Sequence, residues 1–252
     1  RALVIGVTGW PGVGKSSLVS RIAKSFLVEG KKVGIVAVDP TSPISGGGLL
    51  GDRIRLRDIE GRENLFIRSV ASRGHHGGLS RSARPFVKIM EAMGCDVVLL
   101  ETVGVGQDQT TVSLIADTTI IVVAPGLGDY LQAIKSGILE IGDIFVVNKA
   151  DRPDADKAAL DLESAIQMRE KEGWRPTVVK TIAIDGTGIE DLMREIQGHT
   201  THCSREKDMV TRKISAAKDE IREAVKARLL NHFMGKDGLT NEATNRYARE
   251  IC

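Results

Sequence analysis

Eight consecutive residues near the start of the chain combine three glycines with a lysine and a serine. They read Gly9-Trp10-Pro11-Gly12-Val13-Gly14-Lys15-Ser16 and match the pattern GxxxxGK[ST]. Because glycine lacks Cβ, such a backbone can wrap closely enough for its N–H groups to meet phosphate oxygens, and a following helix adds the positive end of its dipole. The pattern predicts a phosphate-binding loop, with Lys15 at the β- and γ-phosphates and Ser16 on Mg²⁺. The residues expected to contact the phosphates are Gly12, Val13, Gly14, Lys15, Ser16 and Ser17.

A second pattern, Asn148-Lys149-Ala150-Asp151, follows a short apolar run. The Asp151 carboxylate could accept hydrogen bonds from both N1–H and the exocyclic amine of guanine, a pair of donors that adenine lacks. Asn148 is expected to brace the loop and the base edge, and the stem of Lys149 to lie along the ring face. An NKxD sequence alone is more typical of an ordinary strand-to-helix turn. Its place after a phosphate-binding loop favours a guanine site.

The segment 181–188 is a weaker signal for the same site. It resembles the GTPase loop in which an alanine backbone N–H contacts guanine O6. Ala183 is therefore a further candidate for binding the base.

Three carboxylates, Asp39, Asp52 and Glu101, are candidates to support Mg²⁺. This ion prefers an octahedral shell of oxygen ligands that includes several waters, so not all three need to touch it. The alternative for each is a helix cap or a carboxylate that braces a loop.

Glu101-Thr102-Val103-Gly104 takes the place of the DxxG switch of GTPases, and the Gly104 amide is expected to meet the γ-phosphate. The next residue, Val105, cannot hydrogen-bond a water molecule, so slow intrinsic hydrolysis is expected. Gln107 is a nearby substitute, although a surface role is an alternative. The stretches expected to respond to the γ-phosphate are 45–52, 103–109 and 125–135.

Short runs of β-branched residues alternate with amphipathic stretches and would position these loops. This rhythm predicts an α/β fold of the P-loop NTPase type, a mostly parallel, doubly wound sheet flanked by helices. The expected strands are 3–8, 33–39, 64–69, 96–101, 118–124, 144–148 and 177–183. The expected helices are 15–29, 80–93, 130–141, 154–172 and 189–196.

Two parts of the chain are expected, a GTPase domain at 1–200 and a helical extension at 201–252. In the extension, Val210, Ile214, Ala217 and Ile221 recur every three or four residues as one apolar stripe. The extension could pack back on the domain, or serve in dimerisation or partner docking.

Composition excludes several classes of function. The 252 residues carry 35 Lys plus Arg against 33 Asp plus Glu, so no strong basic field argues for nucleic acid. The apolar runs are far shorter than the roughly 20 residues of a membrane helix, and neither a span nor a signal peptide is expected. Three widely spaced cysteines are typical of a reducing compartment, the cytoplasm or, in a eukaryote, the mitochondrial matrix.

Together these segments resemble one family, the methylmalonyl-CoA mutase-associated GTPases, also known as ArgK- or MeaB-type proteins, within the metallochaperone-like P-loop GTPases. The resemblance is carried by residues 9–16, 38–42, 46–52, 101–107, 125–135 and 148–151. It implies a homodimeric GTPase that uses GTP and Mg²⁺ and binds an adenosylcobalamin-dependent acyl-CoA mutase, gating cofactor loading and protecting the enzyme. It also makes Lys135 a candidate to complete the active site when the partner docks. Two departures are the absence of helices before the first strand and Ile182, where many members have Ser.

Two other functions share parts of this pattern. A nickel-inserting metallochaperone GTPase would need a metal relay, for which the candidates are His75-His76 and the group His199, His202 and Cys203, all otherwise expected in exposed loops. An ATP-dependent small-molecule kinase linked to amino-acid transport would share the phosphate loop, but Asp151 argues against adenine.

Overall fold

The computed structural model describes residues 1–39, 59, 61–71, 78–102, 112–126, 138–168 and 173–205, together with 217–218, 221–222, 224–226 and 228–229. Its contacts divide the chain into two units, Arg1–Glu206 and Lys207–Cys252. The second unit follows the longest helix of the first. Each unit is described by itself.

The first unit is built on a seven-stranded sheet in which every pairing is parallel, as the sequence predicts for an α/β fold of the P-loop NTPase type. The strand order is β3-β2-β4-β1-β5-β6-β7. The strands are β1 (Leu3–Gly9), β2 (Val33–Asp39), β3 (Leu65–Ala71), β4 (Val97–Glu101), β5 (Thr118–Val123), β6 (Ile144–Asn148) and β7 (Thr177–Thr181). With β1 near the middle, successive strands add on one side of it and then on the other, and ligands of such sheets bind where this direction changes.

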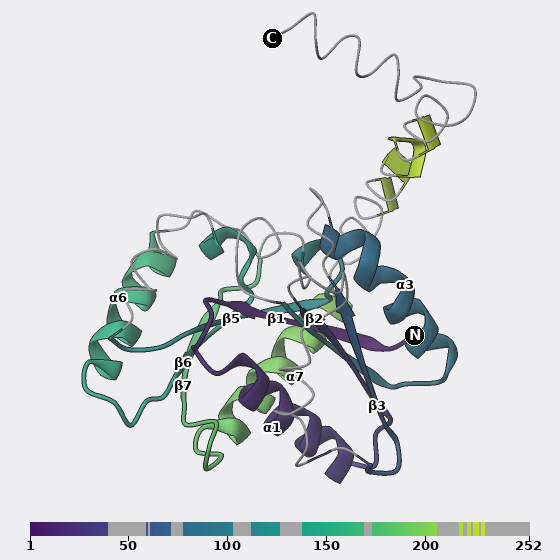
Figure 1. Ribbon diagram of the computed structural model, residues 1–252. Helices are drawn as coiled ribbons and strands as arrows, with labels where there is room; N and C mark the ends of the chain where they lie inside the picture. The colour runs from purple at the N-terminus through teal and green to yellow at the C-terminus, as the bar shows by residue number, and fades with distance from the viewer. Residues whose placement is uncertain are drawn as a thin grey trace, which may run out of the picture. The chain divides into compact units, whose positions relative to one another are not determined.

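Helices cover both faces of the sheet (Figure 1). On one face, α1 (Lys15–Val28) and α7 (Ile189–Arg205) pack on alternate strand residues such as Ile5 and Val7. On the other, α3 (Gly78–Ala92) covers one half of the sheet and α6 (Ala155–Gln167) the other. The central strands β1, β4, β5 and β6 are almost completely buried because both faces are covered.

Three helix predictions differ from the structure. The helix expected at 154–172 is shorter, since α6 ends at Gln167 with Met168 as its C-cap. The helix expected at 130–141 falls mostly outside the described residues, and Ile138–Ile141 forms a 3-10 turn, as does Val112–Leu114. The predicted end of the last helix is wrong, since α7 continues to Arg205 and does not stop at residue 196. It therefore carries His199, His202 and Cys203 on a helix rather than in an exposed loop.

In the second unit the described residues are helical. Ile221, Val225 and Leu229 recur every four residues and are each more than half exposed within this chain. They continue the apolar stripe that the sequence predicts.

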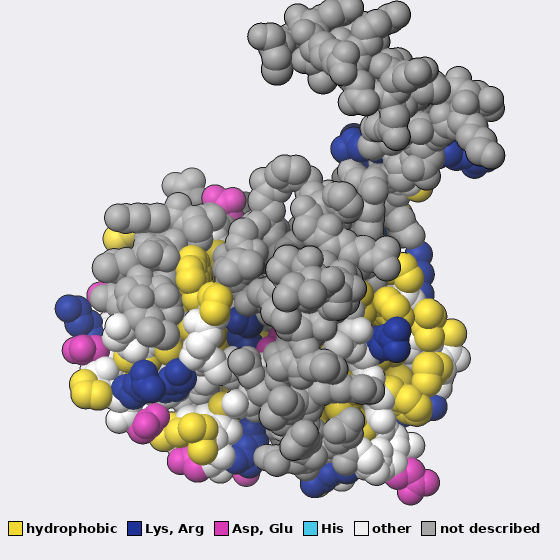
Figure 2. Space-filling model, viewed as in Figure 1, with side chains coloured by type: hydrophobic (Ala, Val, Ile, Leu, Met, Phe, Trp, Pro, Cys, Tyr) yellow, Lys and Arg dark blue, Asp and Glu magenta, His cyan; other side chains and the backbone are white. Residues whose placement is uncertain are grey.

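Surface charge is mixed. On the face shown in Figure 2, Lys and Arg are interspersed with Asp and Glu over the described surface. Within the described residues, the helices are all too short or too polar to span a bilayer.

Candidate functional site

Predicted site residues from three segments of the chain lie at the carboxyl edge of the central strands. Gly9 ends β1, Glu101 ends β4 and Asn148 ends β6, so the parallel sheet brings these three to one edge. α1 begins immediately after the loop that follows β1, with Lys15 and Ser16 in its first turn. The sequence motifs predict that the nucleotide binds at this edge.

Two glycines of the loop are required by its geometry. Gly9 has φ +143°, and a Cβ there would lie 2.0 Å from the Val122 carbonyl oxygen on β5. Gly14 has φ +95°, and its Cβ would lie 2.4 Å from Asn148 Nδ2. Gly14 is also the N-cap of α1 and makes no side-chain capping bond, which leaves first-turn N–H groups available to an anion.

Lys15 is folded over the loop. Its Nζ donates hydrogen bonds to the Gly9 carbonyl at 2.8 Å and to the Trp10 carbonyl at 2.9 Å. The side chain is buried. The loop thus holds a positive charge beside the uncapped start of α1.

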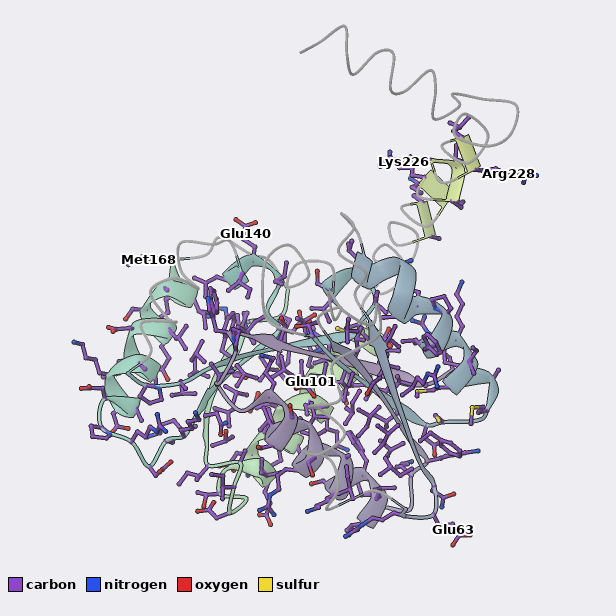
Figure 3. All side chains as sticks on the ribbon, in the orientation of Figure 1. Glu63, Glu101, Glu140, Met168, Lys226 and Arg228 are labelled. Atoms are coloured by element: carbon purple, nitrogen blue, oxygen red, sulfur yellow. The ribbon has the colours of Figure 1, made fainter. Side chains whose placement is uncertain are left out.

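Ser16 and Glu101 form the candidate metal site. The Ser16 hydroxyl donates to Glu101 Oε1 at 2.6 Å, and both side chains are buried. Figure 3 shows Glu101 in the interior of the first unit, whereas Glu63 and Glu140 lie at its periphery. A hydroxyl and a carboxylate are hard oxygen donors of the kind Mg²⁺ takes, so these residues fit the ion.

A pair of threonine hydroxyls, which the sequence analysis did not identify, lies next to this site. Thr102 Oγ1 donates to Thr8 Oγ1 at 2.8 Å, and the Thr102 N–H donates to the Val7 carbonyl at 3.2 Å. Both threonines are buried. They fix Thr102, the residue after Glu101, against the last residues of β1 before the phosphate loop.

Asn148 joins the two halves of the site. Its Nδ2 donates to the Val13 carbonyl at 2.8 Å, while its Oδ1 accepts from Thr181 Oγ1 at 3.1 Å and from the Ala183 N–H at 3.0 Å. One buried side chain therefore links the phosphate loop, β6 and the loop after β7. The Ala183 N–H, expected to contact guanine O6, is bonded here to Asn148.

The neighbours of Asn148 are more open. Lys149 has φ +59°, and its Nζ donates to the Gly12 carbonyl at 2.6 Å, which draws its stem across the phosphate loop. Asp151, three residues after the end of β6, is exposed. Its carboxylate is accessible to a ligand.

Other predicted residues cannot be placed. Asp39 ends β2, but its side chain is not described. Asp52, Gly104, Gln107 and Lys135 lie outside the described residues.

A family model for methylmalonyl-CoA mutase-associated GTPases, MeaB, matches residues 1–238. The chain belongs to the MeaB family of GTPases. It is an enzyme that binds guanine nucleotides and hydrolyses GTP.

Three relatives illustrate how far the similarity extends. GTPase ArgK of Escherichia coli is 37% identical over 253 residues, which cover 98% of this chain and 75% of ArgK. The mitochondrial methylmalonic aciduria type A homolog of Mus musculus is 37% identical over 201 residues, 77% of this chain and 48% of the mouse protein. The crystal structure of a LAO/AO transport system kinase superposes with a TM-score of 0.76 at 30% identity, covering 99% of this chain and 74% of that one.

In this MeaB-family chain, His199 and Cys203 are buried in the core. His199 is fully buried: its Nδ1 lies 2.9 Å from Thr118 Oγ1, and its Nε2 lies 3.2 Å from Cys203 Sγ and 3.5 Å from Asp143 Oδ1. The Trp174 ring contacts His199 edge-on. Among the described side chains, no three His, Cys, Asp or Glu are grouped to hold a metal, and His75 and His76 lie outside them.

This cluster predicts a pH-dependent stability. Burial alone lowers the pKa of His199, but hydrogen bonds with Asp143 and Cys203 outweigh it and raise the pKa from 6.5 to about 9. Since the folded state binds the proton more tightly, the stabilisation is complete below pH 6.5 and is lost as the pH rises to about 9. The loss should be on the order of 2 to 3 kcal/mol. Urea unfolding between pH 6 and about 9.5 measures it.

The substitution His199→Gln is the control for this prediction. It should flatten the pH dependence, because a neutral amide cannot titrate. A wild-type stability that stays level or increases across that range would contradict the assignment.

Proposed function

We propose that the protein binds GTP or GDP with Mg²⁺ at this edge of the sheet and acts as a chaperone or gate for an adenosylcobalamin-dependent acyl-CoA mutase of the methylmalonyl-CoA mutase type. The nucleotide half rests on Asn148, whose hydrogen bonds to Val13, Thr181 and Ala183 tie the phosphate loop to the candidate base loops. The mutase half is supported by the description of the family.

On the phosphate side, each residue has a defined part. The N–H groups of the loop and of the first turn of α1 bind phosphate oxygens, and Lys15 supplies the positive charge for the β- and γ-phosphates. Ser16 and Glu101 would hold Mg²⁺, with Asp39 and Asp52 as further oxygen ligands. The bound ion offsets negative charge that develops on the phosphate oxygens.

On the base side, Asp151 accepts from N1–H and the amine of guanine, while Asn148 keeps the surrounding loops in register. Lys149, bonded to Gly12, presents its stem to the ring. The Ala183 N–H, which donates to Asn148 Oδ1 in this structure, would turn to guanine O6 when the base is bound.

Hydrolysis is slow in the isolated protein because Val105 cannot orient a water molecule. Gly104 senses the γ-phosphate, and Lys135 completes the site when the mutase docks. The second unit, Lys207–Cys252, serves in forming the homodimer or in docking the partner through the exposed Ile221, Val225 and Leu229.

A binding and rate experiment tests the mutase half. The GTPase is immobilised and tested for binding to four purified cobalamin mutases, of the methylmalonyl, isobutyryl, ethylmalonyl and hydroxyisobutyryl types. The rate of GTP hydrolysis is then measured with and without each mutase. We expect one type to associate and to raise the rate at least about tenfold. The variant Lys15→Ala should show no stimulation. If none of the four mutases binds and none changes the rate, the chaperone role is wrong.

A further inference from the structure

Arg21 lies on α1, six residues after Lys15, and reaches the loop that follows β7. Its Nε donates to the Ala183 carbonyl at 2.9 Å, and its Nη2 donates to the Ile184 carbonyl. One guanidinium thus binds two consecutive backbone carbonyls of a segment 162 residues away in the sequence. Its planar set of donors allows this with a single side chain.

Ala183 is consequently held from both sides. Its N–H donates to Asn148 Oδ1, and its carbonyl accepts from Arg21. Asn148 belongs to β6 and Arg21 to the helix that carries Lys15 and Ser16. The position of Ala183 therefore depends jointly on the base side and on the phosphate side of the site.

Besides the Arg21 bonds, the loop is fixed to α1 by the Ala183 side chain, which is buried in the same core cluster as Val19 and Ile22. It is closed internally by the Ile182 N–H to Thr187 carbonyl bond at 2.9 Å and by the Thr187 N–H to Asp185 Oδ1 bond at 2.8 Å. Ile184 is 81% exposed, so its side chain adds no apolar anchor. These internal bonds set the shape of the loop, and the Arg21 bonds hold its backbone on the helix together with the buried Ala183 side chain.

We propose that Arg21 is a positioning residue for base recognition, which holds the loop after β7 on the phosphate-binding helix so that Ala183 faces the guanine. This inference rests on the proposed guanine site. Arg21 does not contact the phosphates in this scheme. Its loss should therefore weaken base binding without weakening phosphate binding.

The test compares Arg21→Met, which keeps the aliphatic stem but removes every donor, with Arg21→Lys, which retains the charge and one donor group. Lys24→Met is the matched control, because Lys24 lies three residues further along the same helix. Affinities for GDP, ADP and inorganic tripolyphosphate are measured for each protein by calorimetry. Thermal unfolding confirms that each variant is folded.

In Arg21→Met, we expect the affinity for GDP to fall about 10- to 30-fold, as the loss of charged hydrogen bonds predicts. The affinity for tripolyphosphate should stay within about twofold, and the KM for GTP should rise while kcat is unchanged. Arg21→Lys should recover part of the loss, and Lys24→Met should behave as the unmodified protein.

Two results would overturn the inference. One is a GDP preference in both Arg21 variants equal to that of the unmodified protein. The other is an equal loss of affinity for GDP and tripolyphosphate, which would mean that Arg21 only stabilises the helix. If the unmodified protein itself binds GDP and ADP equally well, the guanine site is wrong and the inference falls with it.

Discussion

Replacing Asp151 with Asn should reverse the preference for guanine over xanthine. The affinity for GDP should fall at least about 100-fold, and the affinity for xanthosine diphosphate (XDP) should rise. The carboxylate accepts two hydrogen bonds from guanine, whereas an amide offers one acceptor and one donor. Xanthine presents a carbonyl oxygen where guanine has its amine, so the Asn side chain suits xanthine. Because Asp151 is exposed, the substitution should leave the fold intact.

Binding of GDP, XDP and ADP to both proteins measures this effect. Asp154→Asn is a close control, since Asp154 is also exposed. It is the N-cap residue of α6 but makes no side-chain capping hydrogen bond, and its φ of +67° is a conformation that Asn tolerates. It should bind GDP as before. Comparable affinities of the unmodified protein for GDP and ADP would refute guanine recognition, and an unchanged GDP preference in Asp151→Asn would refute the role of Asp151.

The sheet could be predicted from local sequence because its strands are nearly continuous apolar runs. Val33–Asp39 and Ile144–Asn148 are observed with the predicted bounds. Both are buried by helices on the two faces, so their sequences need no alternation and stand out from the amphipathic segments around them. Parallel pairing then follows from the helices between the strands.

The end of α7 could not be predicted in this way. Residues 198–203 read Gly-His-Thr-Thr-His-Cys, most of them poor helix formers, which is why the pattern seemed to stop at Ile196. In the structure His199 is bonded to Thr118 and faces Asp143, and Trp174 packs against it. Contacts with distant parts of the chain keep these residues helical.

The same distinction applies to the site. The phosphate loop and Asn148-Lys149-Ala150-Asp151 are contiguous motifs whose chemistry is evident from their residues. Arg21 and Thr8 belong to no motif, and Thr102 fills a position of the switch motif that is not specified. Their contacts join segments 162 and 94 residues apart. Nothing local identifies such residues, since their function depends on what the sheet places beside them.

The second large effect is expected from Asn148→Ala. The substitution removes three hydrogen bonds at once and leaves the Val13 carbonyl, the Thr181 hydroxyl and the Ala183 N–H without this partner in a buried setting. Each buried group left unsatisfied costs the folded protein about 1 to 3 kcal/mol. If the loops must be held together to bind the nucleotide, about 3 to 4 kcal/mol of binding free energy should be lost with the link, which lowers the affinity for GDP roughly 100- to 1,000-fold. Calorimetric titration with GDP, below the unfolding temperature of the variant, measures the change.

Thr181→Val separates the loss of one bond from the loss of the whole link. It removes only the hydroxyl donor to Asn148 Oδ1, with little change in volume, and should lower GDP affinity less than about tenfold. If Asn148→Ala is folded and binds GDP within about fivefold of the unmodified protein, the phosphate loop and the base loops hold their positions independently. A loss of 100-fold or more in Asn148→Ala would instead show that the buried Asn148 amide couples the phosphate loop to the base loops, since the single bond removed in Thr181→Val could not account for a loss of that size.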